Sequence, residues 1–136
     1  MHLILFIFVL FFSKCNGCFP TEGGGAPEIP LCATCGDLPV LPAPTSDMIR
    51  DNPGGTVTVG MTGVCKSYAI FCPESDTATN AVVIGANGAA NALSAFGPGE
   101  KTATVVCNDQ GEIEGRTVPA GDSIIVTDVY CSRNNA

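Results

Sequence analysis

The stretch KTATVVCNDQGEIEGRTV, residues 101–118, decides the fold class of this 136-residue chain. Ala, Val and Cys occupy every second position of Lys101–Asn108, which is the two-residue period of a half-buried β-strand. The Asn-Asp-Gln-Gly that follows favours a turn in which Gly111 takes a left-handed backbone conformation. Glu112–Val118 is strand-like again, so the stretch predicts an antiparallel hairpin.

Short strand-like segments separated by turns continue on both sides of this hairpin. They are Thr56–Met61, Ser67–Cys72, Ala81–Ile84 and Ser123–Cys131. The last is the longest, and its pattern places Ile125, Val129 and Cys131 on one face; a short helix is an alternative for Ala89–Phe96. Such short strands, in a chain rich in Gly, Pro, Thr, Ala and Val, favour antiparallel pairing. We therefore predict an all-β fold: a small, loop-rich, disulfide-stabilised antiparallel β-sandwich, immunoglobulin-like in style.

The N-terminus carries the pattern of a secretory signal peptide. The apolar run Leu3–Phe12 is about half of the ~20 residues that a membrane helix needs, and small or polar residues follow it. Cleavage after Gly17 or after Cys15 fits this pattern. An uncleaved membrane anchor is the alternative, disfavoured because the run is short and Lys14 follows it.

These features divide the chain into four predicted parts. They are a signal peptide (1–17), a flexible Gly/Pro linker (18–31), a six-cysteine β domain (32–132) and a tail (133–136). Within the domain, Gly36–Gly55 is expected to be a proline-rich loop. The mature protein is expected to be extracellular, with no membrane insertion after cleavage.

Composition argues against several classes of function. The single histidine is His2, inside the predicted signal, so the mature chain lacks the base of Ser-His-Asp and Cys-His catalysis and the His of many zinc sites. The formal net charge of -7 repels phosphate backbones and anionic lipids. We expect no enzymatic activity, no catalytic residue, no cofactor, no metal and no nucleic-acid partner.

Three carboxylates lie close together in the hairpin segment Asn108–Glu114. A calcium site is one interpretation, because Ca²⁺ prefers carboxylate and carbonyl oxygens, but the spacing is not that of an EF-hand loop. A glycosidase pair is another, because alternation places Glu112 and Glu114 on one face, but nothing predicts a cleft around them. A solvated hairpin face with a polar turn explains the same residues and is the prediction.

The chain contains eight cysteines, and export would make them disulfides rather than catalytic thiols. A thioredoxin-like site would place Cys32-Ala-Thr-Cys35 between a strand and a helix, but proline-rich segments flank it here. A zinc ribbon needs a second Cys-x-x-Cys, which Cys65 and Cys72 do not form. The favoured interpretation is two disulfides that leave one short segment for different strands.

The order CATC, CKSYAIFC, VVCNDQG and VYCS resembles the nematode six-cysteine extracellular domain, a family of unknown function. The matching positions are Cys32, Cys35, Cys65, Cys72, Cys107, Asn108, Gly111 and Cys131. The resemblance covers about Cys32–Ser132 and implies an extracellular location. The chain departs from the family at Ile113, where Trp is frequent, and at Ala86, where an aromatic residue is common; both changes make the core smaller.

The resemblance also bears on the disulfide pairing. Some members of the family lack the first and third cysteines together, which implies a Cys32–Cys65 bridge. For the other four cysteines we expect Cys72–Cys107 and Cys35–Cys131, with another pairing left open. If the signal is cleaved before Cys18, that residue is the odd cysteine, available for a disulfide-linked dimer or as a free thiol.

The leading hypothesis is a secreted, non-enzymatic extracellular module with a binding or structural role, associated with a matrix or a surface. Its partner would be an unknown extracellular protein or glycan. The alternative is a secreted protease inhibitor or host-defence effector, for which Gly36–Gly55 is the only candidate inhibitory loop.

Overall fold

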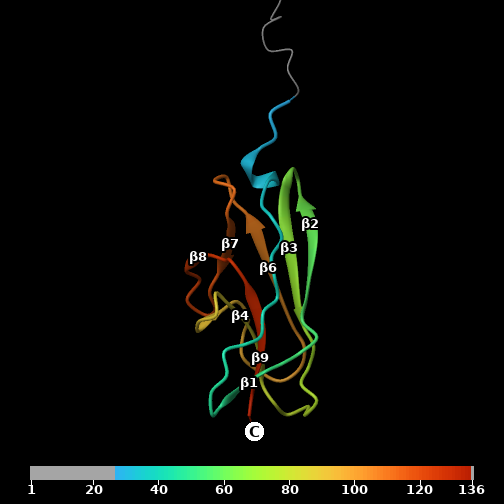
Figure 1. The fold of residues 1–136 in the computed structure, drawn as a ribbon, viewed down its shortest axis with the longest axis vertical. Coiled ribbons are helices and arrows are strands. Elements are labelled where there is room, and N and C mark those ends of the chain that lie inside the picture. The colour runs from blue at the N-terminus through green and yellow to red at the C-terminus, as the bar shows by residue number, and fades with distance from the viewer. Residues whose placement is uncertain (1–26, 136) are drawn as a thin grey trace, which may run out of the picture.

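Two antiparallel sheets pack face to face in the computed structural model, which describes residues 27–135 (Figure 1). The strand order is β1-β9-β4-β5 in the first sheet and β2-β3-β6-β7-β8 in the second. The elements are η1 (Leu31–Ala33, a 3-10 helix), β1 (Ile49–Asp51), β2 (Thr56–Thr62), β3 (Cys65–Cys72), β4 (Val82–Ala86), β5 (Asn91–Ala92), β6 (Lys101–Cys107), β7 (Ile113–Arg116), β8 (Ser123–Ile125) and β9 (Val129–Asn134). The predicted disulfide-stabilised β-sandwich is confirmed. The predicted signal peptide, most of the predicted linker, Cys15 and Cys18 lie outside the described residues.

The predicted hairpin forms from β6 and β7. Gly111 has φ 78°, the left-handed conformation that the turn requires. The side-chain oxygen of Asn108 accepts the backbone N–H groups of Gln110 and Glu112, each at 3.0 Å, and so fixes the turn. The Ala, Val and Cys side chains of β6 alternate toward the core, where Val105 and Cys107 are buried.

The core lies between β3 of the second sheet and β4 and β9 of the first. Tyr68, Ile70, Val82, Ile84 and Val129 are among its fully buried members. Each lies at an alternate position of its strand, so the two-residue period of the sequence becomes the inner face of each sheet.

The segment Ser123–Cys131 is two strands, not the single long one predicted. β8 belongs to the second sheet and β9 to the first, and Ile125 is 42% exposed whereas Val129 is buried. The chain crosses between the sheets where Asn87 holds it: its side chain accepts the N–H of Thr127 at 2.9 Å and donates to the Ile125 carbonyl at 2.8 Å. This long-range pair of hydrogen bonds interrupts the two-residue alternation of Ser123–Cys131 and separates β8 from β9.

The structure also excludes one alternative and differs from two local expectations. Ala89–Phe96 forms no helix, because Asn87 and Gly88 take φ values of 62° and 58° and turn the chain back into β5. The expected loop Gly36–Gly55 contains β1. The expected tail begins inside β9, since Arg133 pairs with Arg50 of β1 and with Val82 of β4.

Three disulfides are present among the described residues. They are Cys32–Cys65, Cys35–Cys107 and Cys72–Cys131. The first is the bridge that the family resemblance implies. The last joins β3 to β9 and so ties the two sheets together through the core.

The expected Cys72–Cys107 and Cys35–Cys131 bonds are wrong for a geometric reason. Cys72 is opposite Lys101, at the start of β6, whereas Cys107 ends that strand. Six residues of strand separate the two positions by about 20 Å, far beyond the ~7 Å that a disulfide spans between Cα atoms. Cys107 instead lies beside the N-terminal segment that carries Cys35.

Candidate functional site

A groove runs over the outer face of the first sheet. Its floor is made by the outward positions of two neighbouring strands: Val83 and Gly85 of β4, opposite Ser132 and Tyr130 of β9. The groove has a volume of about 380 Å³. It is lined by Pro44, Ile49, Val83, Gly85, Gly88, Ala89, Ala90, Ala92, Phe96, Tyr130, Ser132 and Arg133. Small and apolar side chains dominate this list, which is the usual character of a ligand-binding hollow.

The walls of the groove are two loops held in place by hydrogen bonds. On one side, the Asp51 carboxylate accepts the N–H of Ala43 at 2.8 Å, which positions Pro44. On the other side, Gly97 and Val82 exchange backbone hydrogen bonds, which brings Phe96 beside the floor with 62% of its surface exposed. The walls are therefore attached to the sheet rather than free.

Tyr130 covers the backbone of Gly85. A Cβ atom at Gly85 would overlap the phenol ring, so only glycine lets the ring lie flat on the sheet. The Tyr130 hydroxyl donates to the carbonyl of Ala89 at 2.5 Å and thereby ties the β4–β5 turn to β9. The ring is 7% exposed, and this burial, assisted by the charge of Asp128, raises the pKa of Tyr130.

We expect both tyrosines of the chain to titrate above the ordinary tyrosine value of about 10. Burial, and secondarily Asp37, also raises the pKa of Tyr68, whose hydroxyl donates to the Gly36 carbonyl at 2.6 Å. Since Tyr68 and Tyr130 are the only two tyrosines, phenolate absorbance reports them alone. The tyrosines of the unfolded chain ionise at a lower pH than those of the folded protein. The neutral phenols therefore stabilise the folded state below pH ~10, and this stabilisation is lost as the pH rises through the pKa values of the folded protein. A spectrophotometric titration of the folded protein with a midpoint at or below 10 would contradict it.

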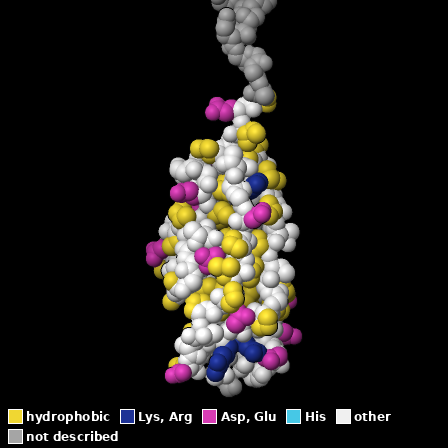
Figure 2. Space-filling model, viewed as in Figure 1, with side chains coloured by type: hydrophobic (Ala, Val, Ile, Leu, Met, Phe, Trp, Pro, Cys, Tyr) yellow, Lys and Arg dark blue, Asp and Glu magenta, His cyan; other side chains and the backbone are white. Residues whose placement is uncertain are grey.

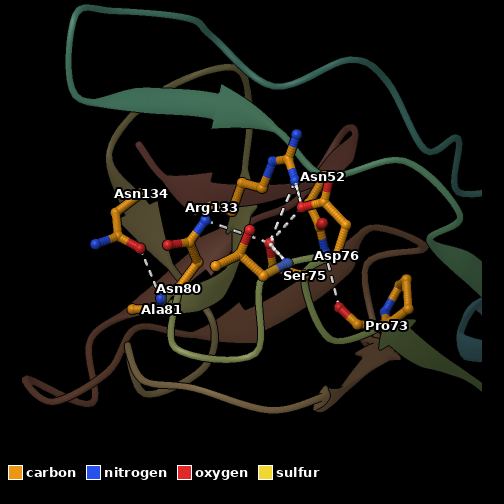
Figure 3. Close-up of polar contacts among 9 residues, drawn as sticks. Asn52, Pro73, Ser75, Asp76, Asn80, Ala81, Arg133 and Asn134 are labelled. Carbon is orange, nitrogen blue, oxygen red and sulfur yellow. Dashed lines mark hydrogen bonds and ion pairs between the residues drawn. The ribbon is translucent and has the colours of Figure 1, made fainter. Parts of the chain in front are cut away.

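A polar cluster closes the end of the sandwich next to the groove (Figure 3). The Arg133 guanidinium forms an ion pair with Asp76 and donates to the Ser75 hydroxyl at 3.2 Å. The Ser75 hydroxyl donates to Asp76, and this bond, together with Arg133, holds the pKa of the Asp76 carboxyl below its ordinary value. Asn52 extends the cluster by donating to the Pro73 carbonyl at 2.8 Å. These contacts hold Arg133 at the rim, where its charge is already partnered.

Charges are distributed unevenly over the surface. In Figure 2 most of the visible basic side chains gather at the end of the molecule that carries β1 and the C-terminus, and another lies near the opposite end. Acidic side chains are scattered over the whole visible face, this end included. Arg50 and Arg133 are direct partners across β1 and β9, which accounts for two basic groups at that end.

The carboxylates of Asn108–Glu114 form a hairpin face. The Asn108 oxygen is occupied by the turn, and its amide group lies 3.4 Å from Glu114. Hydrogen bonds from Ser123 and then Asn108 lower the pKa of the Glu114 carboxyl. Within residues 27–135, no group of three or more His, Cys, Asp and Glu side chains is placed to hold a metal ion.

The six cysteines named from the sequence are all in disulfides, and none lines the groove. The sequence does not predict the groove, because alternation identifies the inward positions of a strand and the groove consists of outward ones. Two signals were available: Gly85 within an apolar strand, and the Asn87-Gly88 turn beside it.

Comparison of the chain with protein-family models, with curated proteins and with solved structures gives no match. In the part of the chain that the structure describes, no helix is long and apolar enough to cross a membrane.

Proposed function

We propose that the protein is a secreted, non-enzymatic extracellular module that binds an apolar segment of another extracellular protein in the groove of the first sheet. The observation that carries this proposal is the set of three disulfides. Two of them tie the N-terminal segment to one end of the second sheet, at β3 and β6, and the third joins the two sheets. Small domains stapled in this way are typical of oxidising compartments outside the cytosol. The N-terminal signal pattern and the resemblance to a nematode extracellular domain support the same location.

The chemistry of the groove favours a protein partner over a glycan. A glycan presents many hydroxyls that need hydrogen-bond partners, whereas the lining supplies mainly the Cβ atoms of alanines and apolar side chains. Gly88 and the alanines of the lining are small and leave room for a ligand to enter the groove. An extended segment bearing one or two apolar side chains fits a hollow of this size and lining.

The inhibitor alternative is less well supported. A protease inhibitor presents an exposed rigid loop, but the middle of Gly36–Gly55 is docked on β9. Leu41 donates to the Val129 carbonyl at 2.8 Å, and the N–H of Val129 donates to the Pro39 carbonyl at 3.0 Å. The backbone of this segment is therefore used within the domain.

The substitution Ala90→Glu tests the groove. It places a charged, longer side chain in the apolar wall. We therefore expect binding of the amphipathic dye 8-anilinonaphthalene-1-sulfonate, whose rings bind apolar surface, to weaken about tenfold, equivalent to ~1.4 kcal/mol. The matched control is Ala78→Glu, the same change at an exposed alanine that does not line the groove. Dye fluorescence titration of the secreted protein and both variants gives the answer; equal weakening by the two substitutions would contradict the site.

The function itself is tested with extracellular extracts. The immobilised full secreted protein is expected to retain a protein partner that the Ala90→Glu variant loses and the Ala78→Glu variant keeps. Retention of the same glycan by all three forms would overturn the proposed partner class. Hydrolytic turnover by the purified protein would overturn its non-enzymatic character.

A further inference from the structure

Strand β2 is an uncovered sheet edge of unusual length for this molecule. The other three sheet edges are β1, β5 and β8, which have three, two and three residues, whereas β2 has seven. Short edge strands are a common device by which proteins avoid edge-to-edge pairing. Figure 1 shows β2 at the margin of the second sheet with β3 on one side only.

Nothing within the described part of the chain occupies the free side of β2. Its backbone pairs with β3 along the whole strand, and no other hydrogen bond between residues 27 and 135 reaches Thr56–Thr62. Alternate residues of an edge strand therefore present N–H and C=O groups to the outside. Residues 56–65 also contain no proline and no charged side chain, the other common ways of blocking an edge.

The two faces of β2 differ in chemistry. Val59 is opposite Tyr68 of β3 and Val57 is opposite Ile70, so the valines lie on the core side. Yet Val59 is 50% exposed and Met61 is 59% exposed, because the sheet ends there. The outer face carries threonines and Gly60. The edge thus presents half-exposed apolar side chains on its core-side face and threonines on its outer face.

We propose that β2 pairs with β2 of a second copy of this chain, antiparallel and centred on Val59. That register places Val57 opposite the second copy's Met61 and Thr56 opposite its Thr62, so apolar residues meet apolar ones and threonine meets threonine. The two five-stranded sheets join into one continuous sheet.

The self-complementary register favours a second copy as the occupant of this edge, and the charge of the strand does not oppose it. The chain has a formal net charge of -7, so two copies repel each other over most orientations. Pairing at β2 brings no charged side chain of the strand into the contact, because the stretch 56–65 is neutral along its whole length. Seven paired residues give a contact about 24 Å long, which belongs to the class of small, reversible interfaces. We therefore expect a monomer–dimer equilibrium that depends on concentration, independent of any disulfide through Cys18.

The test is sedimentation equilibrium of the full secreted protein together with two variants. Val59→Lys places a charge at the centre of the pairing and is expected to raise the dissociation constant at least tenfold. Ile125→Lys is the matched control, because it makes the same change on the opposite edge strand of the same sheet, at a side chain 42% exposed; its dimer is expected to persist. Non-reducing electrophoresis separates any covalent dimer from this equilibrium.

Slow amide exchange in β2 that becomes fast on dilution would support the pairing and does not require a variant. A secreted protein that stays monomeric at several hundred micromolar would overturn the proposal. So would a Val59→Lys variant that dimerises as well as the unchanged chain, or an Ile125→Lys variant that is equally impaired.

Discussion

Replacing both Cys72 and Cys131 by alanine is expected to have the largest effect on stability, because theirs is the one of the three bonds between described residues that joins the two sheets. The bond between them closes a loop of 59 residues, for which chain entropy gives about 4 kcal/mol. Both sulfurs are buried in the core between the sheets, so their loss also leaves unfilled space. Because domains of this size have total stabilities of about 5–15 kcal/mol, we expect a fall in melting temperature of at least ~15 °C and poor secretion.

The Cys32→Ala/Cys65→Ala variant is the matched comparison. It removes a disulfide with a sequence separation of 33 and leaves the two sheets joined. The fall in its melting temperature, measured by circular dichroism, is expected to be smaller than that of the Cys72→Ala/Cys131→Ala variant. If removing the bond near η1 were the more damaging change, the assignment of the β3–β9 bond as the main tie between the sheets would be wrong.

Gly85→Val is expected to have the second largest effect. A side chain at this position overlaps the Tyr130 ring, which must leave the sheet and give up its hydrogen bond to Ala89. Overpacking of this kind costs about 1–3 kcal/mol. We also expect the pKa of Tyr130 to fall back toward the ordinary value and the groove to lose its affinity for the dye, because the ring forms part of its floor.

Gly36→Val is the control, since a Cβ at Gly36 meets no atom within 4 Å. Urea unfolding and phenolate titration of the two variants measure the stability and the tyrosine environment together. Equal stability of the two variants, with Tyr130 unchanged in both, would contradict the close packing of the ring on Gly85.

The elements that could be predicted from the sequence are those whose information is local. The β6–β7 hairpin is specified by its own alternation and by a turn that Asn108 and Gly111 form without help from the rest of the chain. The division of Ser123–Cys131 between two sheets could not be predicted in this way. It depends on Asn87, which lies far away in sequence and holds the crossover by its side chain.

The disulfide pairing and the groove escaped prediction for a related reason. Whether Cys72 reaches Cys107 or Cys131 depends on which end of β6 lies near it, a fact of sheet register rather than of spacing along the chain. The groove depends on two loops closing over the outward faces of β4 and β9. Gly85 and the neighbouring Asn87-Gly88 turn are the sequence signals of this site, because glycine in an apolar strand is typical of close approach by another group.

The measurement that tests the central claim most directly is disulfide mapping by mass spectrometry of the full protein recovered from the medium of expressing cells. We expect a secreted chain in which six cysteines are oxidised as three bonds. These are Cys32–Cys65, Cys35–Cys107 and Cys72–Cys131. A protein found in the cytosol with these thiols reduced, or a secreted one with other bonds, would contradict it.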